Sequence, residues 1–176
     1  FLVPTRPLVL QQAEYVRANC AKPTAVAELQ GAKTDHLTAA EWQDILSSSD
    51  VLVGTAEVFR RALVDTKFLL LKSFSLLIFD ECHNATGNSP MAAIMRDAVH
   101  RIGSQAPRIL GLTASFVHGS LKGIEKKRKD LEGLLQATLF CPDVEERPMD
   151  FEQIAYVQTV LPEMEKVVES KVQALL

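Results

Sequence analysis

Short apolar runs alternate along the first two thirds of the chain with stretches whose apolar residues recur at helical spacing. The apolar runs predict strands over residues 1–4, 25–29, 50–54, 75–80 and 108–113. The periodic stretches predict helices over residues 7–20, 39–47, 56–64 and 90–102. Strands that alternate with helices of this length are typical of right-handed βαβ units, so we predict an α/β fold on a mostly parallel sheet.

Local signals support two of these helices. Thr5 is a candidate N-cap, and Pro7 falls in the first helical turn, where its missing N–H costs little. Thr38, with Glu41 three residues later, matches a capping box. Trp42 lies in the same helix, and we expect it to anchor that helix to the sheet, with stacking on a nucleic-acid base as the alternative.

The pattern changes after residue 115. Residues 121–138 predict a charged amphipathic helix with Ile124, Leu131, Leu134 and Leu135 on one face. Two β-like pieces follow at 138–141 and 153–157, and a last helix is predicted over 163–176. The sheet is therefore expected to end near residue 113. Acidic residues flank the basic run 126–129, which favours a solvated helix face over a nucleic-acid or nuclear-import site.

Composition and charge limit the number of domains, the kind of nucleic-acid site and the cellular location that this chain can have. The 176 residues are 47% apolar and 23% charged, as expected for one globular domain. The net charge of −3 provides no general basic surface, so any nucleic-acid site must come from a local face or from backbone amides. Cys20, Cys82 and Cys141 are odd in number and far apart, which is typical of reduced thiols in an intracellular protein, cytoplasmic or nuclear. No apolar run has the length of a membrane span.

Candidate chemistry lies where the strand over 75–80 ends, at Asp80 and Glu81. Ligands of open parallel sheets bind at the carboxyl ends of strands. Two adjacent acids are costly to bury there unless a cation or a reacting water uses them. Nucleotide hydrolysis has this requirement, with one carboxylate for Mg²⁺ and a neighbour for the attacking water. The alternative is a solvated turn.

The next predicted strand ends in Thr113 and, two residues later, Ser115. If the two strands are adjacent and parallel, these hydroxyls come within reach of Asp80 and His83 and can sense the acid pair through hydrogen bonds. Taken alone, they could equally be ordinary turn or cap residues. Cys82, between the acids and His83, is interpreted as a small packing residue rather than a reactive thiol.

Two further strand ends lead into helices at Pro4-Thr5 and Gly54-Thr55. A threonine and free backbone N–H groups at such a position can hold a phosphate. Each threonine alone could be a routine N-cap. The combination of four polar strand ends in this order is more specific than any one of them.

These segments together resemble the first RecA-like domain of superfamily 2 helicases, in the DECH-box branch. Residues 1–12 are similar to motif Ia, 53–59 to the TxxxL-type motif, 77–83 to motif II and 112–115 to motif III, and Gly31 falls where motif Ib lies. Within that branch, residues 107–115 are most similar to the helicase region of Dicer proteins. RIG-I-like receptors and Hef-type DNA translocases are near relatives.

The resemblance implies a partial RecA-like parallel sheet flanked by helices, with a C-terminal helical connector. It implies a partial ATP-binding domain over 1–118, the end of the lobe and a connector over 119–160, and the start of a helical insert domain over 161–176. The N-terminal P-loop unit of the family is expected to be missing. Gly31-Ala32-Lys33-Thr34 does not replace it, because the motif needs Lys directly after Gly.

The resemblance also implies roles for individual residues. Asp80 would coordinate Mg²⁺ through water, and Glu81 would polarise the attacking water, so these two are the catalytic candidates. The residues that would couple nucleotide state to nucleic acid are His83, Thr113 and Ser115. The residues that would contact the sugar-phosphate backbone are Pro4, Thr5, Gly31 and Thr55.

The leading hypothesis is a fragment of a Dicer-like, ATP-dependent double-stranded-RNA helicase or translocase, with ATP and Mg²⁺ as cofactors. Its expected partners are double-stranded RNA, a second RecA-like domain and the helical insert of the same chain, with no membrane. Two alternatives stay open at this point. One is a Hef-type DNA translocase, and the other is a helicase-like module that binds RNA or a partner without hydrolysis.

Overall fold

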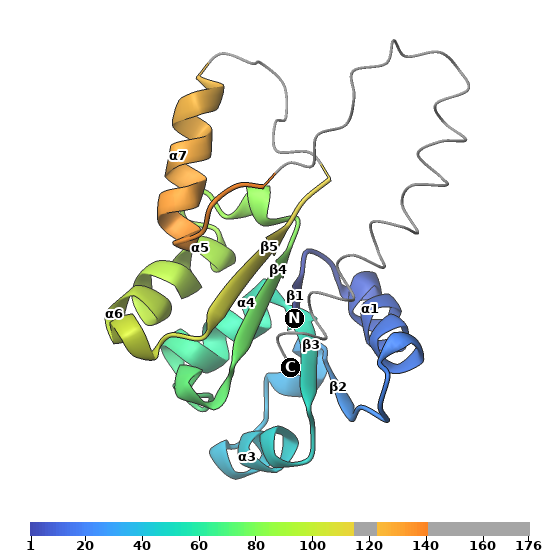
Figure 1. Ribbon diagram of the computed structural model, residues 1–176. Helices are drawn as coiled ribbons and strands as arrows, with labels where there is room; N and C mark the ends of the chain where they lie inside the picture. The colour runs from blue at the N-terminus through green and yellow to red at the C-terminus, as the bar shows by residue number, and fades with distance from the viewer. Residues whose placement is uncertain (115–122, 141–176) are drawn as a thin grey trace, which may run out of the picture. The chain divides into compact units, whose positions relative to one another are not determined.

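Five parallel strands form the sheet that the alternating pattern predicts (Figure 1). The computed structural model describes residues 1–114 and 123–140. The strands are β1 (Leu2–Val3), β2 (Val26–Leu29), β3 (Val51–Thr55), β4 (Leu76–Asp80) and β5 (Arg108–Leu112). They are arranged in the order β2-β3-β1-β4-β5, and all neighbouring pairs are parallel. The predicted α/β fold class is confirmed.

The shortest strand, β1, lies in the middle of the sheet. Leu2 pairs with Gly54 of β3 on one side and with Phe79 of β4 on the other, and Val3 pairs with Thr55. Leu2 and Val3 are both fully buried. Because β1 separates β3 from β4, the segment between these two later strands must cross over β1 on one face of the sheet.

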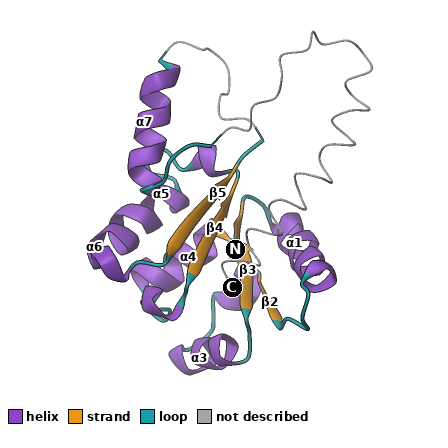
Figure 2. Ribbon diagram, viewed as in Figure 1, coloured by secondary structure: helices purple, strands orange, loops and turns teal. Residues whose placement is uncertain are grey.

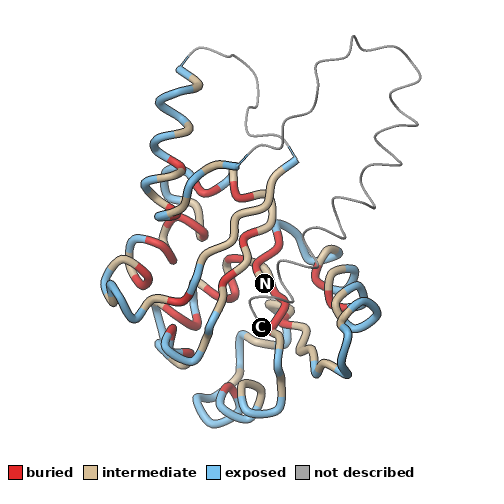
Figure 3. Tube along the Cα trace, in the orientation of Figure 1, coloured by how far each residue is buried: buried red, intermediate tan, exposed pale blue. Residues whose placement is uncertain are grey.

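Helices cover both faces of the sheet (Figure 2). On one face, α1 (Arg6–Asn19) buries Val9 and Ala13 against Val3 and Val53. On the other, α3 (Ala39–Ser47), α4 (Ala56–Arg60) and α5 (Pro90–Ile94) pack into a larger core cluster that includes the strand residues Leu77 and Phe79. The buried positions accordingly follow the strands and the inner sides of the helices (Figure 3).

The helices predicted over 56–64 and 90–102 each contain a wider turn. The first continues from α4 into a π-helical turn (Arg61–Asp65), and the second runs from α5 through a π-helical turn (Met95–Val99) into α6 (His100–Ile102). Sequence periodicity did not predict the shortest elements, since one turn of helix has too few residues to show a period. These are α2 (Gly31–Thr34) and the 3₁₀ turns Leu71–Ser73, Cys82–Asn84 and Gly103–Gln105.

The capping box at the start of α3 is confirmed. The Glu41 N–H donates to Thr38 Oγ1 at 3.3 Å, and the Thr38 N–H donates to Glu41 Oε2 at 2.7 Å. Trp42 is only 3% exposed and belongs to the core cluster, so it anchors α3 and has no free face on which a base could stack. Thr5 takes the N-cap position of α1, but contrary to expectation its side chain makes no capping hydrogen bond.

Helix α7 (Ile124–Leu135) matches the amphipathic prediction. Leu131 and Leu135 are buried in the core cluster, and the partly buried Arg128 on the same side of the helix pairs with Glu125 at 3.4 Å and Glu132 at 3.8 Å. The three lysines of the basic run, Lys126, Lys127 and Lys129, are exposed, so they form the solvated face that was predicted.

The β-like assignment of 138–141 is wrong over the described residues 138–140, which form no strand. The Leu139 N–H donates to Glu132 Oε1 at 2.8 Å and so is tied back to α7. Residue 141 and the elements predicted over 153–157 and 163–176 lie outside the described residues. Within residues 1–114 and 123–140, no helix combines the length and the apolar character needed to cross a bilayer.

Two glycines provide a matched test of this packing. A Cβ at Gly54 would lie 2.9 Å from Leu29 Cβ and 3.1 Å from the Leu29 carbonyl oxygen, so Gly54→Ala must push β3 away from the edge strand β2. We expect it to lower the free energy of unfolding by about 1–3 kcal/mol. Gly133 in α7 has open space around it, so Gly133→Ala should raise the same quantity by about 0.5–1 kcal/mol. Urea-induced unfolding measures both, and equal effects would contradict the packing described.

Candidate functional site

The parallel register brings the predicted site residues to one edge of the sheet. The last residues of neighbouring strands are paired, Val3 with Thr55 and Asp80 with Leu112. All five carboxyl ends therefore face the same way, where ligands of such sheets bind. The predicted residues at the ends of these strands, or just after them, are Pro4, Thr5, Gly31, Thr55, Asp80, Glu81, His83 and Thr113. Ser115 lies outside the described residues.

Four of these residues, Asp80, Glu81, His83 and Thr113, form a hydrogen-bonded group that we call the acid cluster. His83 Nδ1 lies 2.7 Å from Thr113 Oγ1 and 3.2 Å from Glu81 Oε2. The Thr113 hydroxyl donates to Glu81 Oε2 at 3.4 Å. The contact joins the ends of β4 and β5, 30 residues apart in the chain.

The backbone at Glu81 makes this group possible. Glu81 has a left-handed conformation, with φ 49° and ψ 48°, which is uncommon for a residue other than glycine. The turn leads directly from β4 into the 3₁₀ turn Cys82–Asn84, where the Asn84 N–H donates to the Glu81 carbonyl oxygen at 2.9 Å. Such a conformation persists only where the surroundings over-determine it, and it is frequent at functional sites. No sequence signal indicated it.

Asp80 lies in an environment that disfavours its charge. Burial, and then the neighbouring negative charge of Glu81, raise the pKa of the Asp80 carboxyl above its ordinary value, and the Glu81 N–H, donated to Oδ1 at 3.1 Å, opposes the shift only in part. In the described part of the chain, neither acid forms an ion pair with a lysine or arginine. Two adjacent acids without a lysine or arginine partner can be compensated by a bound cation.

A magnesium ion fits this donor set. Carboxylate oxygens are the ligands it prefers, usually one or two of them, completed by water and substrate phosphates. The described residues contain no group of three or more histidine, cysteine or acidic side chains that could hold a metal by themselves. An ion at Asp80 would therefore take most of its ligands from outside these side chains.

Cys82 is confirmed as a packing residue. It is 3% exposed, and burial raises the pKa of its thiol to about 11, so it is not a thiolate at neutral pH. A Cβ added at Gly111 of β5 would lie 2.9 Å from Cys82 Sγ, which shows how closely the 3₁₀ turn packs on the neighbouring strand.

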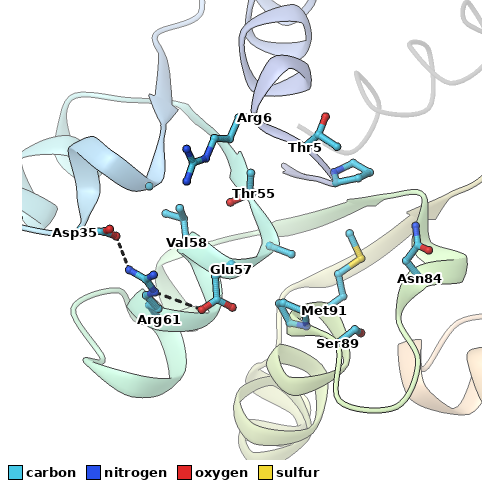
Figure 4. A pocket seen from close by; sticks show the side chains of 14 residues that line it. Thr5, Arg6, Asp35, Thr55, Glu57, Val58, Arg61, Asn84, Ser89 and Met91 are labelled. Atoms are coloured by element: carbon cyan, nitrogen blue, oxygen red, sulfur yellow. Dashed lines mark hydrogen bonds and ion pairs between the residues drawn. The ribbon is translucent and has the colours of Figure 1, made fainter.

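A pocket of about 520 Å³ occupies the other half of the same edge (Figure 4). Its lining includes all four residues predicted to contact a nucleic-acid backbone, Pro4, Thr5, Gly31 and Thr55. They come from the ends of β1, β2 and β3, so the tertiary structure brings together residues up to 51 positions apart. The acid cluster lies beside this pocket and does not line it.

The pocket threonines do not cap their own helices. Thr55 is the N-cap residue of α4 and Thr5 that of α1, yet neither side chain makes a capping hydrogen bond. Thr38 and Ser89, at the starts of α3 and α5, do cap in the usual way. Thr5 and Thr55 thus occupy N-cap positions, as expected, without the side-chain capping bond, and their hydroxyls are available to a ligand.

Several residues of the pocket were not predicted. Arg6, Asp35, Glu57 and Arg61 contribute charge, and Asn84, Ser89, Pro90 and Met91 come from the segment after β4. Arg6 could have been found from its place next to Thr5. Glu57 and Asn84 likewise lie close in sequence to Thr55 and His83, whereas only the fold brings Asp35, Arg61 and residues 89–91 to the same pocket.

Comparison with known proteins supports the family resemblance that the polar strand ends indicated. A family model described as DEAD/DEAH box helicase matches residues 1–122. The chain belongs to the DEAD/DEAH box helicase family. The resemblance inferred from the motifs is therefore confirmed, and the acid cluster and the pocket are features of a helicase domain.

Individual relatives support the same family assignment. This DEAD/DEAH box helicase chain is 38% identical to Endoribonuclease Dicer homolog 3 of Arabidopsis thaliana over 152 residues, which is 83% of the chain and 9% of that protein. It is 38% identical to Protein Dicer of Schizosaccharomyces pombe over 122 residues, 65% of the chain and 9% of that protein. The crystal structure of the Pyrococcus furiosus Hef helicase domain superposes with a TM-score of 0.60 at 30% identity, covering 77% of this chain and 27% of that one. The chain thus spans about a tenth of the length of the curated relatives it matches.

The raised pKa of the Asp80 carboxyl leads to a prediction about how the stability of this helicase domain depends on pH. Because the folded state raises the Asp80 pKa, ionisation of Asp80 destabilises the fold as the pH rises from the ordinary value of 3.8 through the raised one. Asp80→Asn removes that cost and keeps the oxygen that accepts from Glu81. We expect the variant to unfold at a higher urea concentration than the unsubstituted chain at pH 7, with the gain disappearing below the ordinary carboxyl pKa.

Asp44→Asn is the control for this measurement, since Asp44 is exposed on α3 and the substitution removes the same charge. A gain of Asp80→Asn that stayed constant from pH 3 to pH 7 would show that the carboxylate charge is not its cause.

Proposed function

We propose that this chain is part of an ATP-dependent double-stranded-RNA helicase or translocase of the Dicer type. The carrying observation is that one sheet edge holds both a carboxylate pair that has no lysine or arginine partner among the described residues and a pocket with uncapped threonine hydroxyls. These are the two parts that a nucleotide-driven motor must place side by side. Similarity to Dicer proteins over most of the chain supports RNA as the nucleic acid.

In the proposed reaction, Asp80 holds Mg²⁺ through water and Glu81 orients the attacking water. The metal would neutralise charge on the phosphates of ATP. Glu81 suits its part because its carboxylate is half-exposed and is held from one side by Thr113 and His83. A fixed carboxylate at the edge of the sheet can accept a proton from a water placed against it.

The 3₁₀ turn Cys82–Asn84 provides a physical link between hydrolysis and nucleic acid. Its His83 contacts Glu81 and Thr113 in the acid cluster, and its next residue, Asn84, lines the pocket. A change in the hydrogen bonds of Glu81 therefore reaches the pocket through two adjacent residues of one turn. We assign His83, Thr113 and Ser115 to this coupling.

The pocket residues Pro4, Thr5, Gly31 and Thr55 would contact the sugar-phosphate backbone rather than the bases. Such contacts position a strand without reading its sequence, as shape-based recognition of double-stranded RNA requires. The second RecA-like domain and the helical insert would complete the grip and the ATP site. They are the partners this proposal requires.

Two alternative functions are a DNA translocase and a binding module that does not hydrolyse ATP. A DNA translocase of the Hef type is supported by the structural match to the Hef helicase domain. A non-hydrolysing binding module is disfavoured by the adjacent, partly buried acids Asp80 and Glu81, because a scaffold has no use for such a pair.

ATP hydrolysis by the full-length protein tests the proposal. We expect double-stranded RNA to stimulate steady-state ATP turnover more than single-stranded RNA or either form of DNA. Glu81→Gln should lower kcat by about 10²–10⁴-fold, the usual contribution of a positioned general base, while RNA binding is retained. Stronger stimulation by double-stranded DNA would select the Hef-type alternative, and RNA binding without any ATP turnover would select the scaffold.

The 176 residues by themselves should show no ATP hydrolysis above background. They contain no Gly-Lys-Ser or Gly-Lys-Thr sequence, so they lack the phosphate-binding loop that neutralises the transferred phosphoryl group. A phosphate-release assay on the purified chain, with Asp80→Asn as the control, measures this. Robust turnover that Asp80→Asn abolishes would refute the division of the ATP site that we propose.

A further inference from the structure

The pocket that we assign to a phosphate backbone contains as many anions as cations. Arg6 and Arg61 line it together with Asp35 and Glu57. A polyanion gains from cations that it can neutralise and is repelled by fixed carboxylates. Whether the pocket attracts a phosphate therefore depends on which of its cations are already paired with its acids.

Arg6 is the simpler of the two cations. It is exposed, and within the described residues its guanidinium takes part in no hydrogen bond or ion pair. Figure 4 shows it reaching from the start of α1 into the pocket, and a Cβ at Gly31 would lie 3.8 Å from its Nη2. Arg6 is thus available to a phosphate without giving up another partner.

Arg61 is held by two carboxylates instead. Its Nη1 donates to Asp35 Oδ1 in a short ion pair, and its Nε donates to Glu57 Oε1 at 3.3 Å. Both contacts are drawn in Figure 4. Arg61 begins the π-helical turn after α4, while Asp35 follows α2, so the Asp35–Arg61 pair joins two elements of the pocket wall that are 26 residues apart.

Of the two acids, Asp35 is the one that neutralises Arg61. Glu57 already accepts from Arg60 Nε and from Arg60 Nη2, both at 2.9 Å, and these bonds are the largest cause of its lowered pKa. Asp35 forms its side-chain ion pair with Arg61 and with no other basic residue among those described. The charge of Arg61 is therefore balanced mainly by Asp35.

The Asp35–Arg61 ion pair can be replaced by a contact between Arg61 and a phosphate at little cost in stability. The side chains of Arg61 and Asp35 are 48% and 38% exposed, and ion pairs at that exposure contribute little to stability. A guanidinium has five N–H donors and can bind phosphate in a bidentate manner. With Glu57 at Nε, release of Asp35 from Nη1 leaves the Nη1–Nη2 side of Arg61 free for such a contact. A phosphate entering the pocket can displace Asp35 from Arg61.

We propose that Arg61 is a further phosphate-binding residue of this pocket and that Asp35 is its internal competitor. The inference rests on the proposed function, since it requires a nucleic-acid strand in the pocket. Asp35 also belongs to the element that presents Gly31, because the Asp35 N–H donates to the Gly31 carbonyl oxygen at 2.9 Å. Because Asp35 competes with the phosphate for Arg61, the pocket binds each phosphate less tightly. Weaker binding favours the release of each phosphate that translocation along a strand requires.

Asp35→Asn tests the competition directly, because it removes the anion and leaves Glu57 to position Arg61. Fluorescence anisotropy of the full chain with a short fluorescein-labelled RNA duplex, over a series of salt concentrations, gives the dissociation constant and its salt slope. We expect Asp35→Asn to bind about two- to fivefold more tightly at low salt. Its slope of log K against log salt should be steeper by up to about one. Asp44→Asn, the same charge change on α3 outside the pocket, should alter neither quantity.

The double variant Asp35→Asn/Arg61→Gln separates competition from simple repulsion. Arg61→Gln alone should weaken binding and reduce the salt slope by about one. If Asp35 acts through Arg61, most of the gain from Asp35→Asn disappears in the Arg61→Gln background. A gain of the same size in both backgrounds would overturn the proposal.

The remaining outcomes distinguish this inference from the function on which it rests. If the unsubstituted chain binds RNA and Thr55→Ala weakens that binding, but Asp35→Asn leaves it unchanged or weaker, Asp35 is a structural tie and only the competition fails. If the chain binds no RNA duplex or DNA duplex at low salt, both the backbone site and the competition are wrong.

Discussion

The site depends on the pairing of the two-residue strand β1 with strands on both of its sides. Leu2 pairs with Gly54 and with Phe79, and these contacts hold the two halves of the sheet in one parallel register. Without them the β2-β3 pair and the β4-β5 pair would be separate two-stranded units. Because β1 is central and fully buried, the strand ends that carry the pocket and those that carry the acid cluster stay at fixed spacing.

This constraint explains why two chemically different sites are neighbours. The pocket collects residues that follow β1, β2 and β3, whereas the acid cluster belongs to β4 and β5. The only strand pair between the halves is β1 with β4, and the 3₁₀ turn after β4 contributes His83 to one site and Asn84 to the other. Coupling across so short a connection requires a small shift of one turn and no long pathway through the core.

The accuracy of the sequence predictions follows the range of the interactions involved. All five strands and the helix over 39–47 were placed well, because alternating apolar runs and the capping box are local signals. The left-handed turn at Glu81 was not predicted, since it depends on packing against β5 rather than on its own residue type. The strand expected over 138–141 is absent from the described residues 138–140, where the Leu139 N–H donates to the Glu132 side chain of α7, a tertiary contact that local β-propensity does not predict.

Local pattern and motif spacing were enough to determine the α/β class, the family and the identity of the residues at four of the polar strand ends. These follow from the sequence because strand ends in a parallel sheet share an edge whatever the helices between them do. Only the tertiary structure decided that Thr5 and Thr55 leave their hydroxyls uncapped and that Asp35 restrains Arg61. The physical reason is that hydrogen bonds and ion pairs at this edge join residues far apart in the chain, whose distance and direction are set by helix packing and not by sequence spacing.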